Sequence, residues 1–180
     1  MERLPFAATP AAAPYDGLAP LPVVLLLDHI RSAYNAGAFF RTADAAGLER
    51  LYLSGITPTP ANPALAKTAL GAELTMPWEY APDALVPLRL LRARGFEIAA
   101  IETSPRALDL FDWQPRYPLC IVFGNEVDGL APEVLNACDA QIRLPMLGRK
   151  HSLNVATAGG IVVFEILRKY RRLREGAPAL

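Results

Sequence analysis

Three short blocks of the chain combine charged, amide and small side chains in a way that a hydrophobic core alone does not require. They are Asn35–Gly47, Gly124–Leu130 and Leu144–Ala158. The last block runs from an expected strand through a loop into the last helix, with Ser152-Leu-Asn154 at the helix start. Each block follows a predicted strand, and open α/β sheets bind their ligands outside the carboxyl ends of the strands. We therefore expect the three blocks to form one site.

Arg41 is the cationic side chain of the first block, and its neighbours on a helix are small. Gly37 lies one turn before it and Ala45 one turn after it, which leaves the guanidinium accessible to a large ligand. The alternative is an ordinary surface arginine that pairs with Asp44, three residues on, for roughly a few tenths of a kcal/mol. Asn35 can likewise be a plain helix N-cap. The block by itself therefore leaves both interpretations open.

The second block, Gly124-Asn-Glu-Val-Asp-Gly-Leu130, matches neither common phosphate loop. Gly124 and Gly129 have the Walker A separation, but Leu130 stands where that motif needs lysine. No G-x-G-x-x-G occurs anywhere in the chain, so a dinucleotide site has no support. A nucleoside triphosphatase and a dehydrogenase are set aside on this ground. A tight turn with solvated acidic side chains and a ligand-binding loop both remain open.

The third block predicts a helix that starts at Ser152, a natural N-cap residue. Gly159 and Gly160 inside this helix should each cost about 1 kcal/mol relative to alanine. We expect another backbone, from this chain or a partner chain, to approach closely there. Residues spaced by three and four mark the expected buried face: Leu153, Ala156, Gly160, Val163, Leu167 and Tyr170.

Between these blocks strand-like and helix-like segments alternate, which predicts an α/β fold with a parallel sheet. The expected strands are residues 23–28, 50–54, 97–101, 119–123 and 141–144. The expected helices are residues 35–46, 63–70, 84–94, 132–137 and 152–172. Residues 1–20, rich in alanine and proline, are expected to be a flexible lead-in, and residues 21–180 a single domain.

Composition excludes several classes of protein. A net charge of zero, from 18 basic and 18 acidic residues, argues against a protein that coats nucleic acid. The apolar run Val23–Leu27 is too short to span a membrane, and the start Met1-Glu-Arg3 does not resemble a signal peptide. Cys120 and Cys138, with two scattered histidines, predict neither a disulfide framework nor a zinc site. A reducing, cytoplasmic location is expected.

In residue types, order and spacing, the three blocks resemble the three motifs of the SpoU (TrmH-like) family of RNA 2′-O-ribose methyltransferases. The patterns are N-x-G-x-x-x-R-T-A-x-x-x-G at 35–47, F-G-N-E-x-x-G at 123–129 and L-P-M-x-G-x-x-x-S-L-N-V at 144–155. The resemblance covers roughly residues 23 to 172 and includes K-T-A-L-G-A at 67–72. Val127 departs from the glycine of many members, and His151 occupies a variable position.

This resemblance implies a SPOUT fold, an α/β domain with a deep C-terminal trefoil knot that binds S-adenosylmethionine. General topology rules would discard a knot, so the fold expected from the residues alone is a doubly wound parallel sheet. The family is typically dimeric, so the resemblance also implies a homodimer. Its chemistry requires no metal.

The resemblance also assigns site residues. The cofactor would be held, largely through backbone groups, by Thr103, Gly124, Asn125, Glu126, Leu144, Pro145, Met146, Ser152 and Leu153. The methyl-transfer site would be lined by Asn35, Arg41, Glu126, Ser152 and Asn154. A guanidinium keeps its proton to a pKa above about 12. We therefore expect Arg41 to bind phosphate and stabilise the developing alkoxide, not to act as a base, while Ser152 and Asn154 orient the ribose.

The expected function is methyl transfer from S-adenosylmethionine to a ribose 2′-hydroxyl of RNA. We favour tRNA over rRNA because no added RNA-binding domain is evident in the sequence. The alternatives are an rRNA 2′-O-methyltransferase and a catalytically silent RNA-binding module on the same fold. Retention of Arg41, Glu126, Ser152 and Asn154 favours an enzyme. The basic run Arg168–Arg174 is either a solvated helix end or a phosphate contact.

Overall fold

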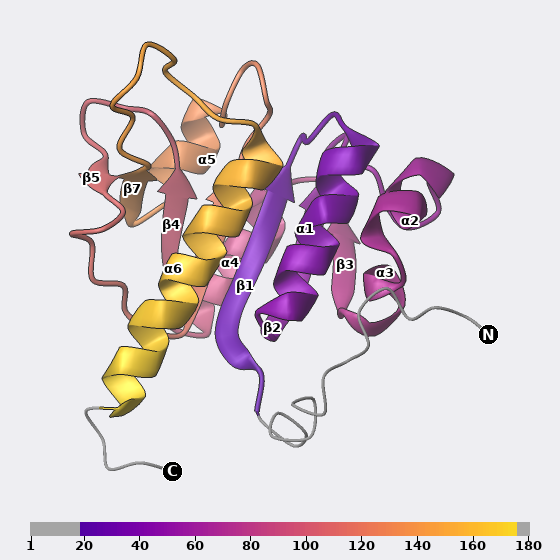
Figure 1. Ribbon diagram of the computed structural model, residues 1–180, viewed down its shortest axis with the longest axis horizontal. Helices are drawn as coiled ribbons and strands as arrows, with labels where there is room; N and C mark the ends of the chain where they lie inside the picture. Colours follow the sequence, from indigo (N-terminus) through magenta and orange to yellow (C-terminus); the bar gives the residue numbers. More distant parts are fainter. Residues whose placement is uncertain (1–18, 176–180) are drawn as a thin grey trace.

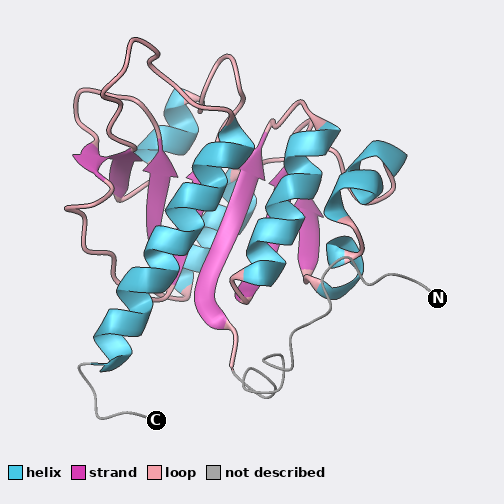
Figure 2. Ribbon diagram, in the orientation of Figure 1, coloured by secondary structure: helices cyan, strands magenta, loops and turns pink. Residues whose placement is uncertain are grey.

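The computed structural model describes residues 19–175 and is built around a parallel seven-stranded sheet (Figure 1). The strand order is β3-β2-β1-β6-β4-β7-β5. The strands are β1 Leu21–Asp28, β2 Leu48–Ser54, β3 Trp78–Ala81, β4 Glu97–Ile101, β5 Leu108–Asp109, β6 Leu119–Phe123 and β7 Ala140–Arg143. The helices are α1 Ala33–Ala45, α2 Pro63–Ala69, α3 Ala72–Thr75, α4 Leu85–Ala93, α5 Pro132–Asn136 and α6 Val155–Glu175 (Figure 2). The expected α/β class with a parallel sheet is confirmed.

The middle strands β1 and β6 are buried on both faces, which explains their nearly continuous apolar sequences. Successive side chains of a strand point to opposite faces of the sheet. Leu25 and Leu27 therefore join the core under α1, α2, α3 and α6. Val24 and Leu26 join the second core, under α4 and α5. Figure 1 shows α1 and α6 side by side in front of the sheet and α4 behind it.

The predicted strands at 97–101 and 119–123 are confirmed as β4 and β6, and most other predicted boundaries lie within three residues of the structure. The sequence did not predict β3, α3 or β5. These elements have only two to four residues, which is too short for apolar periodicity to appear. The predicted lead-in falls almost entirely on residues 1–18, outside the described residues.

Both predicted helix caps were wrong. Ser32 caps α1, with its side chain accepting a hydrogen bond from Asn35 N at 3.3 Å. Asn154 precedes α6, and its Oδ1 accepts from the backbone N–H groups of Ala156 and Thr157 at 3.0 and 3.2 Å. The loop after β7 stays non-helical through Asn154, so the first free N–H groups of the helix lie within reach of Asn154 instead of Ser152. The amide of Asn35 is thereby left for other contacts.

Two glycines on neighbouring helices allow close packing. A Cβ added to Gly37 of α1 would lie 2.5 Å from the carbonyl oxygen of Leu65 in α2. A Cβ added to Gly159 of α6 would overlap the ring of Phe39 in α1. The expected close backbone approach at Gly159 was therefore wrong, because an aromatic ring fills that space. Gly160 has open space where its side chain would be.

The buried stripe of α6 is rotated relative to the predicted one. Of the predicted positions Val163 is fully buried, whereas Leu153 is exposed. Among the α6 positions up to Leu173, the last buried one is Lys169, whose Nζ donates to the carbonyl oxygen of Leu110 at 2.6 Å and also to that of Trp113. Lys169 therefore does not belong to a solvated basic run, and Arg168 beside it pairs with Glu165 at 2.6 Å. The side chain of Arg174 lies outside the described residues.

Candidate active site

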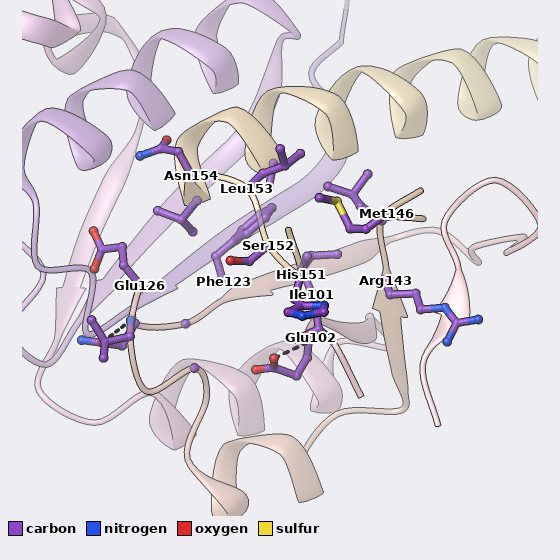
Figure 3. A pocket seen from close by; sticks show the side chains of 18 residues that line it. Ile101, Glu102, Phe123, Glu126, Arg143, Met146, His151, Ser152, Leu153 and Asn154 are labelled. Carbon is purple, nitrogen blue, oxygen red and sulfur yellow. Dashed lines mark hydrogen bonds between the residues drawn. The ribbon is translucent and has the colours of Figure 1, made fainter. Parts of the chain in front are cut away.

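A pocket of about 380 Å³ lies at the carboxyl ends of β4, β6 and β7 (Figure 3). Its walls are the loops that follow these three strands and the first turn of α6. Of the residues predicted to hold a cofactor, those in the wall are Thr103, Gly124, Asn125, Glu126, Leu144, Met146, Ser152 and Leu153. Pro145 is not a lining residue. The pocket size is within the range of small-molecule sites.

The lining fits a ligand with a flat apolar part and a positive charge. Ile101, Phe123 and Val155 provide apolar surface, and the carboxylates of Glu102 and Glu126 lie in the same wall. Exposed backbone groups in the three loops can add directional hydrogen bonds. S-adenosylmethionine combines an adenine ring with a sulfonium cation, so the residues present fit that cofactor.

The loop after β6 is both a tight turn and a pocket wall, the two alternatives that its sequence left open. Asn125 N donates to Gly129 O at 3.1 Å, and Gly129 N donates to Asn125 O at 3.0 Å. A Cβ added to Gly124 would lie 2.6 Å from the backbone carbon of Gly129. Glycine at position 124 is therefore needed to close the turn, which places Glu126 at the mouth of the pocket.

Glu126 joins the first and second sequence blocks. Its carboxylate accepts hydrogen bonds from Arg31 N at 2.9 Å, Ser32 N at 3.2 Å and Asn35 Nδ2 at 2.8 Å. Partial burial opposes ionisation of the carboxyl, but these hydrogen bonds outweigh it and hold the pKa of Glu126 below its ordinary value. Glu126 is therefore a fixed negative charge at neutral pH.

Asn35 extends this connection to the third block. Asn154 Nδ2 donates to Asn35 Oδ1 at 3.1 Å, while Asn154 Oδ1 caps α6. The structure thus links Glu126, Asn35 and Asn154 in one hydrogen-bonded row, although they lie up to 119 residues apart in sequence. Ser152 lies in the pocket wall beside this row.

Arg41 is not brought to this pocket within the chain. It is exposed on α1, six residues after Asn35, which corresponds to roughly 9 Å along the helix axis. The alternative pairing with Asp44 is also absent, because Asp44 accepts a hydrogen bond from Thr75 Oγ1 at 3.0 Å and forms no ion pair within residues 19–175. The Arg41 guanidinium therefore stays available to a ligand.

Sequence reasoning missed three polar side chains of the pocket wall, Glu102, Arg143 and His151 (Figure 3). Glu102 accepts a hydrogen bond from Thr103 N at 2.8 Å and packs where a side chain at position 129 would have to be. It directly follows a correctly predicted strand, so the rule that ligands bind at strand carboxyl ends could have found it.

Two further features concern residues 19–175 as a whole. No group of three or more His, Cys, Asp and Glu side chains in this range is arranged to hold a metal ion. No helix in the same range has the length and apolar character to cross a membrane.

Comparison with known proteins identifies the family. Residues 22–164 match the model of the SpoU rRNA Methylase family. The chain is 34% identical, over 155 residues, to the 23S rRNA (guanosine-2′-O-)-methyltransferase RlmB of Ralstonia nicotianae, covering 86% of this chain but only 61% of that protein. It is 32% identical over 154 residues to the tRNA (guanosine(18)-2′-O)-methyltransferase of Thermus thermophilus, covering 86% of this chain and 77% of that enzyme.

A solved structure extends the comparison to the fold and the ligand. An AdoMet-bound rRNA methyltransferase from Sinorhizobium meliloti superposes with a TM-score of 0.76 at 30% identity, over 86% of this chain and 61% of that one. The chain thus spans less than two thirds of two of these three relatives. The matched region nevertheless contains all three sequence blocks, and the chain belongs to the SpoU rRNA methylase family.

Proposed function

We propose that the protein transfers a methyl group from S-adenosylmethionine to a ribose 2′-hydroxyl of RNA. The observation that carries the proposal is the row Glu126–Asn35–Asn154, which joins the three blocks at the mouth of a pocket of suitable size. Its relatives support the proposal: one is named an rRNA and another a tRNA 2′-O-methyltransferase, and the solved structure of a third contains AdoMet.

In this proposal the chain holds the cofactor by its pocket wall, and the cofactor supplies an electrophilic methyl group on sulfur. Backbone groups of residues 124–126, Leu144 and Met146, with Thr103, Ser152 and Leu153, would hold the adenosine and methionine parts. The ionised Glu126 keeps Asn35 and the loop before α1 in place. Ser152 and Asn154 orient the ribose, and positioning of this kind can remove several kcal/mol from the barrier.

As the hydroxyl oxygen attacks the methyl group, its proton is released to solvent water, and cleavage of the carbon–sulfur bond would leave a neutral thioether as the second product. Arg41 is assigned to bind a neighbouring phosphate and stabilise the negative charge that develops on this oxygen. Its guanidinium has no partner within residues 19–175, as such a role requires. Its distance from the pocket of its own chain is the reason that the proposal includes a second copy of the chain.

The proposed homodimer uses the outer face of α6 and α1. Ile161 and Phe164 are 38% and 49% exposed on α6, and a Cβ added to Gly160 beside them would meet no atom within 4 Å. Exposed apolar side chains of this kind are typical of subunit contacts. Arg41 lies on the adjacent helix α1 and would then lie at the interface, where it can face the pocket of the second copy.

Further parts of the proposal concern fold and location. We propose that the segment from β7 through α6 closes a trefoil knot, which the family membership supports, and that residues 21–180 form one SPOUT domain. A cytoplasmic location is proposed because both cysteines, Cys120 and Cys138, are free thiols. As substrate we propose tRNA ahead of rRNA.

The test is transfer of a tritiated methyl group from S-adenosylmethionine to tRNA and rRNA transcripts, with wild type compared with Arg41→Ala. We expect the wild type to label RNA and the variant to be about 100-fold slower or more, as for loss of other charge-stabilising groups. No transfer by the wild type to any transcript contradicts the enzyme. RNA binding without transfer would instead indicate a silent binding module, and mapping of 2′-O-methyl groups in labelled RNA identifies the substrate.

A further inference from the structure

A second group of polar residues lies at the carboxyl ends of β1 and β2, on the opposite side of β1 from the pocket. Asp28 ends β1, His29 follows it, and Ser54 and Gly55 occupy the same level at the end of β2. Asp28 Oδ1 accepts hydrogen bonds from His29 Nδ1 at 2.8 Å and from Ser54 Oγ at 2.6 Å. The proposed methyl transfer does not use these residues.

The burial of the two partners differs sharply. The side chain of Asp28 is 5% exposed, whereas that of His29 is 52% exposed. Because Nδ1 carries the proton donated to Asp28, the other ring nitrogen, Nε2, is left for a ligand. The buried carboxylate therefore fixes one edge of a half-exposed imidazole, whose opposite edge, Cε1, Nε2 and Cδ2, lies over Gly55.

The backbone is strained to place this ring. His29 has φ of 55°, and within residues 19–175 only Leu70 shares a positive φ among the non-glycine residues. Gly55 also has a positive φ, 60°, and a Cβ there would overlap the imidazole. Backbone strain of this kind is concentrated at functional sites. Glycine at position 29 would relieve it, yet the chain carries histidine.

The loop that carries His29 is tied to the candidate active site. Asn125 Nδ2 donates to His29 O at 2.9 Å. Two and three residues further on, the backbone N–H groups of Arg31 and Ser32 donate to the carboxylate of Glu126. The exposed guanidinium of Arg31 has no partner within the described part of the chain. On the far side, Tyr80 donates from Oη to Gly55 O at 3.0 Å, and its side chain is 44% exposed.

We propose that His29 is an RNA-positioning residue. Its imidazole contacts the nucleotide next to the one that is methylated, and Tyr80 lies at the rim of the same surface. The inference rests on the proposed function, because the partner is the RNA substrate. Unpaired nucleotides are recognised by planar side chains on which bases stack and by hydrogen bonds to base edges and phosphates. A half-exposed imidazole and a half-exposed phenol ring, both in contact with Gly55, supply these groups.

The competing explanation is structural: His29 would only satisfy the buried carboxylate of Asp28. The two explanations predict opposite results for His29→Asn, because asparagine accepts a positive φ and keeps a short polar group beside Asp28. His29→Gly is a second variant that removes the strain. Leu70→Asn is the matched control, since it makes the same change at the other strained position.

Three quantities are measured for each variant: affinity for unfractionated tRNA and for a 23S rRNA transcript by filter binding, affinity for S-adenosylmethionine by calorimetry, and Tm. We expect both His29 variants to bind about tenfold more weakly to whichever of the two RNAs the wild type binds more tightly. Their affinity for the cofactor should be unchanged, and their Tm unchanged or higher. In activity assays the loss should appear in KM for RNA, with KM for the cofactor unchanged. Leu70→Asn should leave RNA affinity unchanged.

A lower Tm with unchanged RNA affinity would show the structural role and overturn the inference, as would unchanged values throughout. Tyr80→Phe should bind RNA as the wild type does, and Tyr80→Ala should bind more weakly. RNA binding by a wild type that transfers no methyl group contradicts the proposed function alone, because the role of His29 is read from binding.

Discussion

Arginine side chains at the amino ends of the strands are paired with carboxylates, whereas the arginines and lysine at the carboxyl ends are not so paired within the described part of the chain. At the amino ends, exposed arginines are neutralised by carboxylates of neighbouring segments. The pairs are Arg92–Asp139, Arg94–Glu49 and Arg116–Glu97, with N–O distances of 3.0, 3.3 and 3.4 Å. At the carboxyl ends, Arg31, Arg143, Arg149 and Lys150 have no ion pair or side-chain hydrogen bond within residues 19–175.

Carboxylates are not lacking at the carboxyl ends. Glu126 and Glu102 lie there, but both accept hydrogen bonds from backbone N–H groups and so fix loops, leaving nearby cations unneutralised. Charges at the amino ends thus link segments of the chain, whereas the named cations at the carboxyl ends have no charged partner within residues 19–175. An anionic partner with many phosphates fits this second arrangement.

The largest expected effect follows from Glu126→Gln. The amide offers one oxygen where the carboxylate accepts three hydrogen bonds, so Asn35 and the loop before α1 lose their alignment. We expect methyl transfer to fall about 100-fold or more. The effect on unfolding should be much smaller, about 1 kcal/mol, because the carboxyl is at the surface. Steady-state kinetics and urea unfolding measure the two quantities, and equal losses in both would contradict a site-specific role.

The pH dependence of the same variant has a definite sign. The folded-state pKa of Glu126 lies below its ordinary value, so its ionised form stabilises the fold above that value. This contribution is lost as pH falls through the lowered pKa. The stability difference between wild type and Glu126→Gln should therefore be constant near neutral pH and shrink below about pH 4. A difference that grows on acidification would show that the carboxylate does not stabilise the fold.

Neutralising the cations at the end of β7 and in the loop after it should produce the second largest effect. In a triple variant that combines Arg143→Gln, Arg149→Gln and Lys150→Gln, RNA affinity at physiological salt should fall by about tenfold or more. The slope of log affinity against log salt should fall by about 2, as expected for three lost phosphate contacts with single-stranded RNA. The matched control neutralises Arg92, Arg94 and Arg116. A reduced slope in the control and not in the loop variant would reverse the comparison.

Asn154→Asp should have a smaller, separable effect. Aspartate keeps the oxygen that caps α6 but lacks the amide N–H that reaches Asn35. We therefore expect Tm to change little and methyl transfer to fall by about tenfold. Asn154→Ala removes both contacts and should also destabilise the protein by about 1 kcal/mol. If the aspartate variant is fully active, the contact with Asn35 is dispensable.

The smallest effect is expected at the amino ends. Arg94→Gln removes one exposed ion pair, with side chains that are 49% and 32% exposed, so stability should fall by less than about 1 kcal/mol. RNA affinity should not change. Chemical unfolding at low and high salt measures the first effect, which should be smaller at high salt. A marked loss of RNA binding would show that phosphates also contact this end.

The sequence predicted those parts of the molecule in which residue type and spacing coincide with a long element. The strands β4 and β6 have clear apolar boundaries, and the three blocks follow strands, so both the sheet and the pocket were within reach. The caps were not, because Ser32, Asn35, Ser152 and Asn154 are all acceptable cap residues. Which of them caps depends on the residue at which the helical backbone begins, and the preceding loop determines that residue.

Long-range contacts were the other limit. Nothing near Lys169 in the sequence indicates that its ammonium is covered by carbonyl groups 56 to 59 residues earlier. Asp28 and Ser54 likewise become partners only because β1 and β2 are in register. The proposed knot and the proposed place of Arg41 beside a second copy would depend on threading and assembly, which no local pattern encodes.

The contact between Gly159 and Phe39 has a consequence for how this family can vary. Because the ring occupies the space of a missing Cβ, neither position can change freely while the other is kept. We expect related chains with alanine or serine at the position of Gly159 to carry a smaller side chain at that of Phe39. Substitutions at these two positions, one on α6 and one on α1, would then be correlated among related chains.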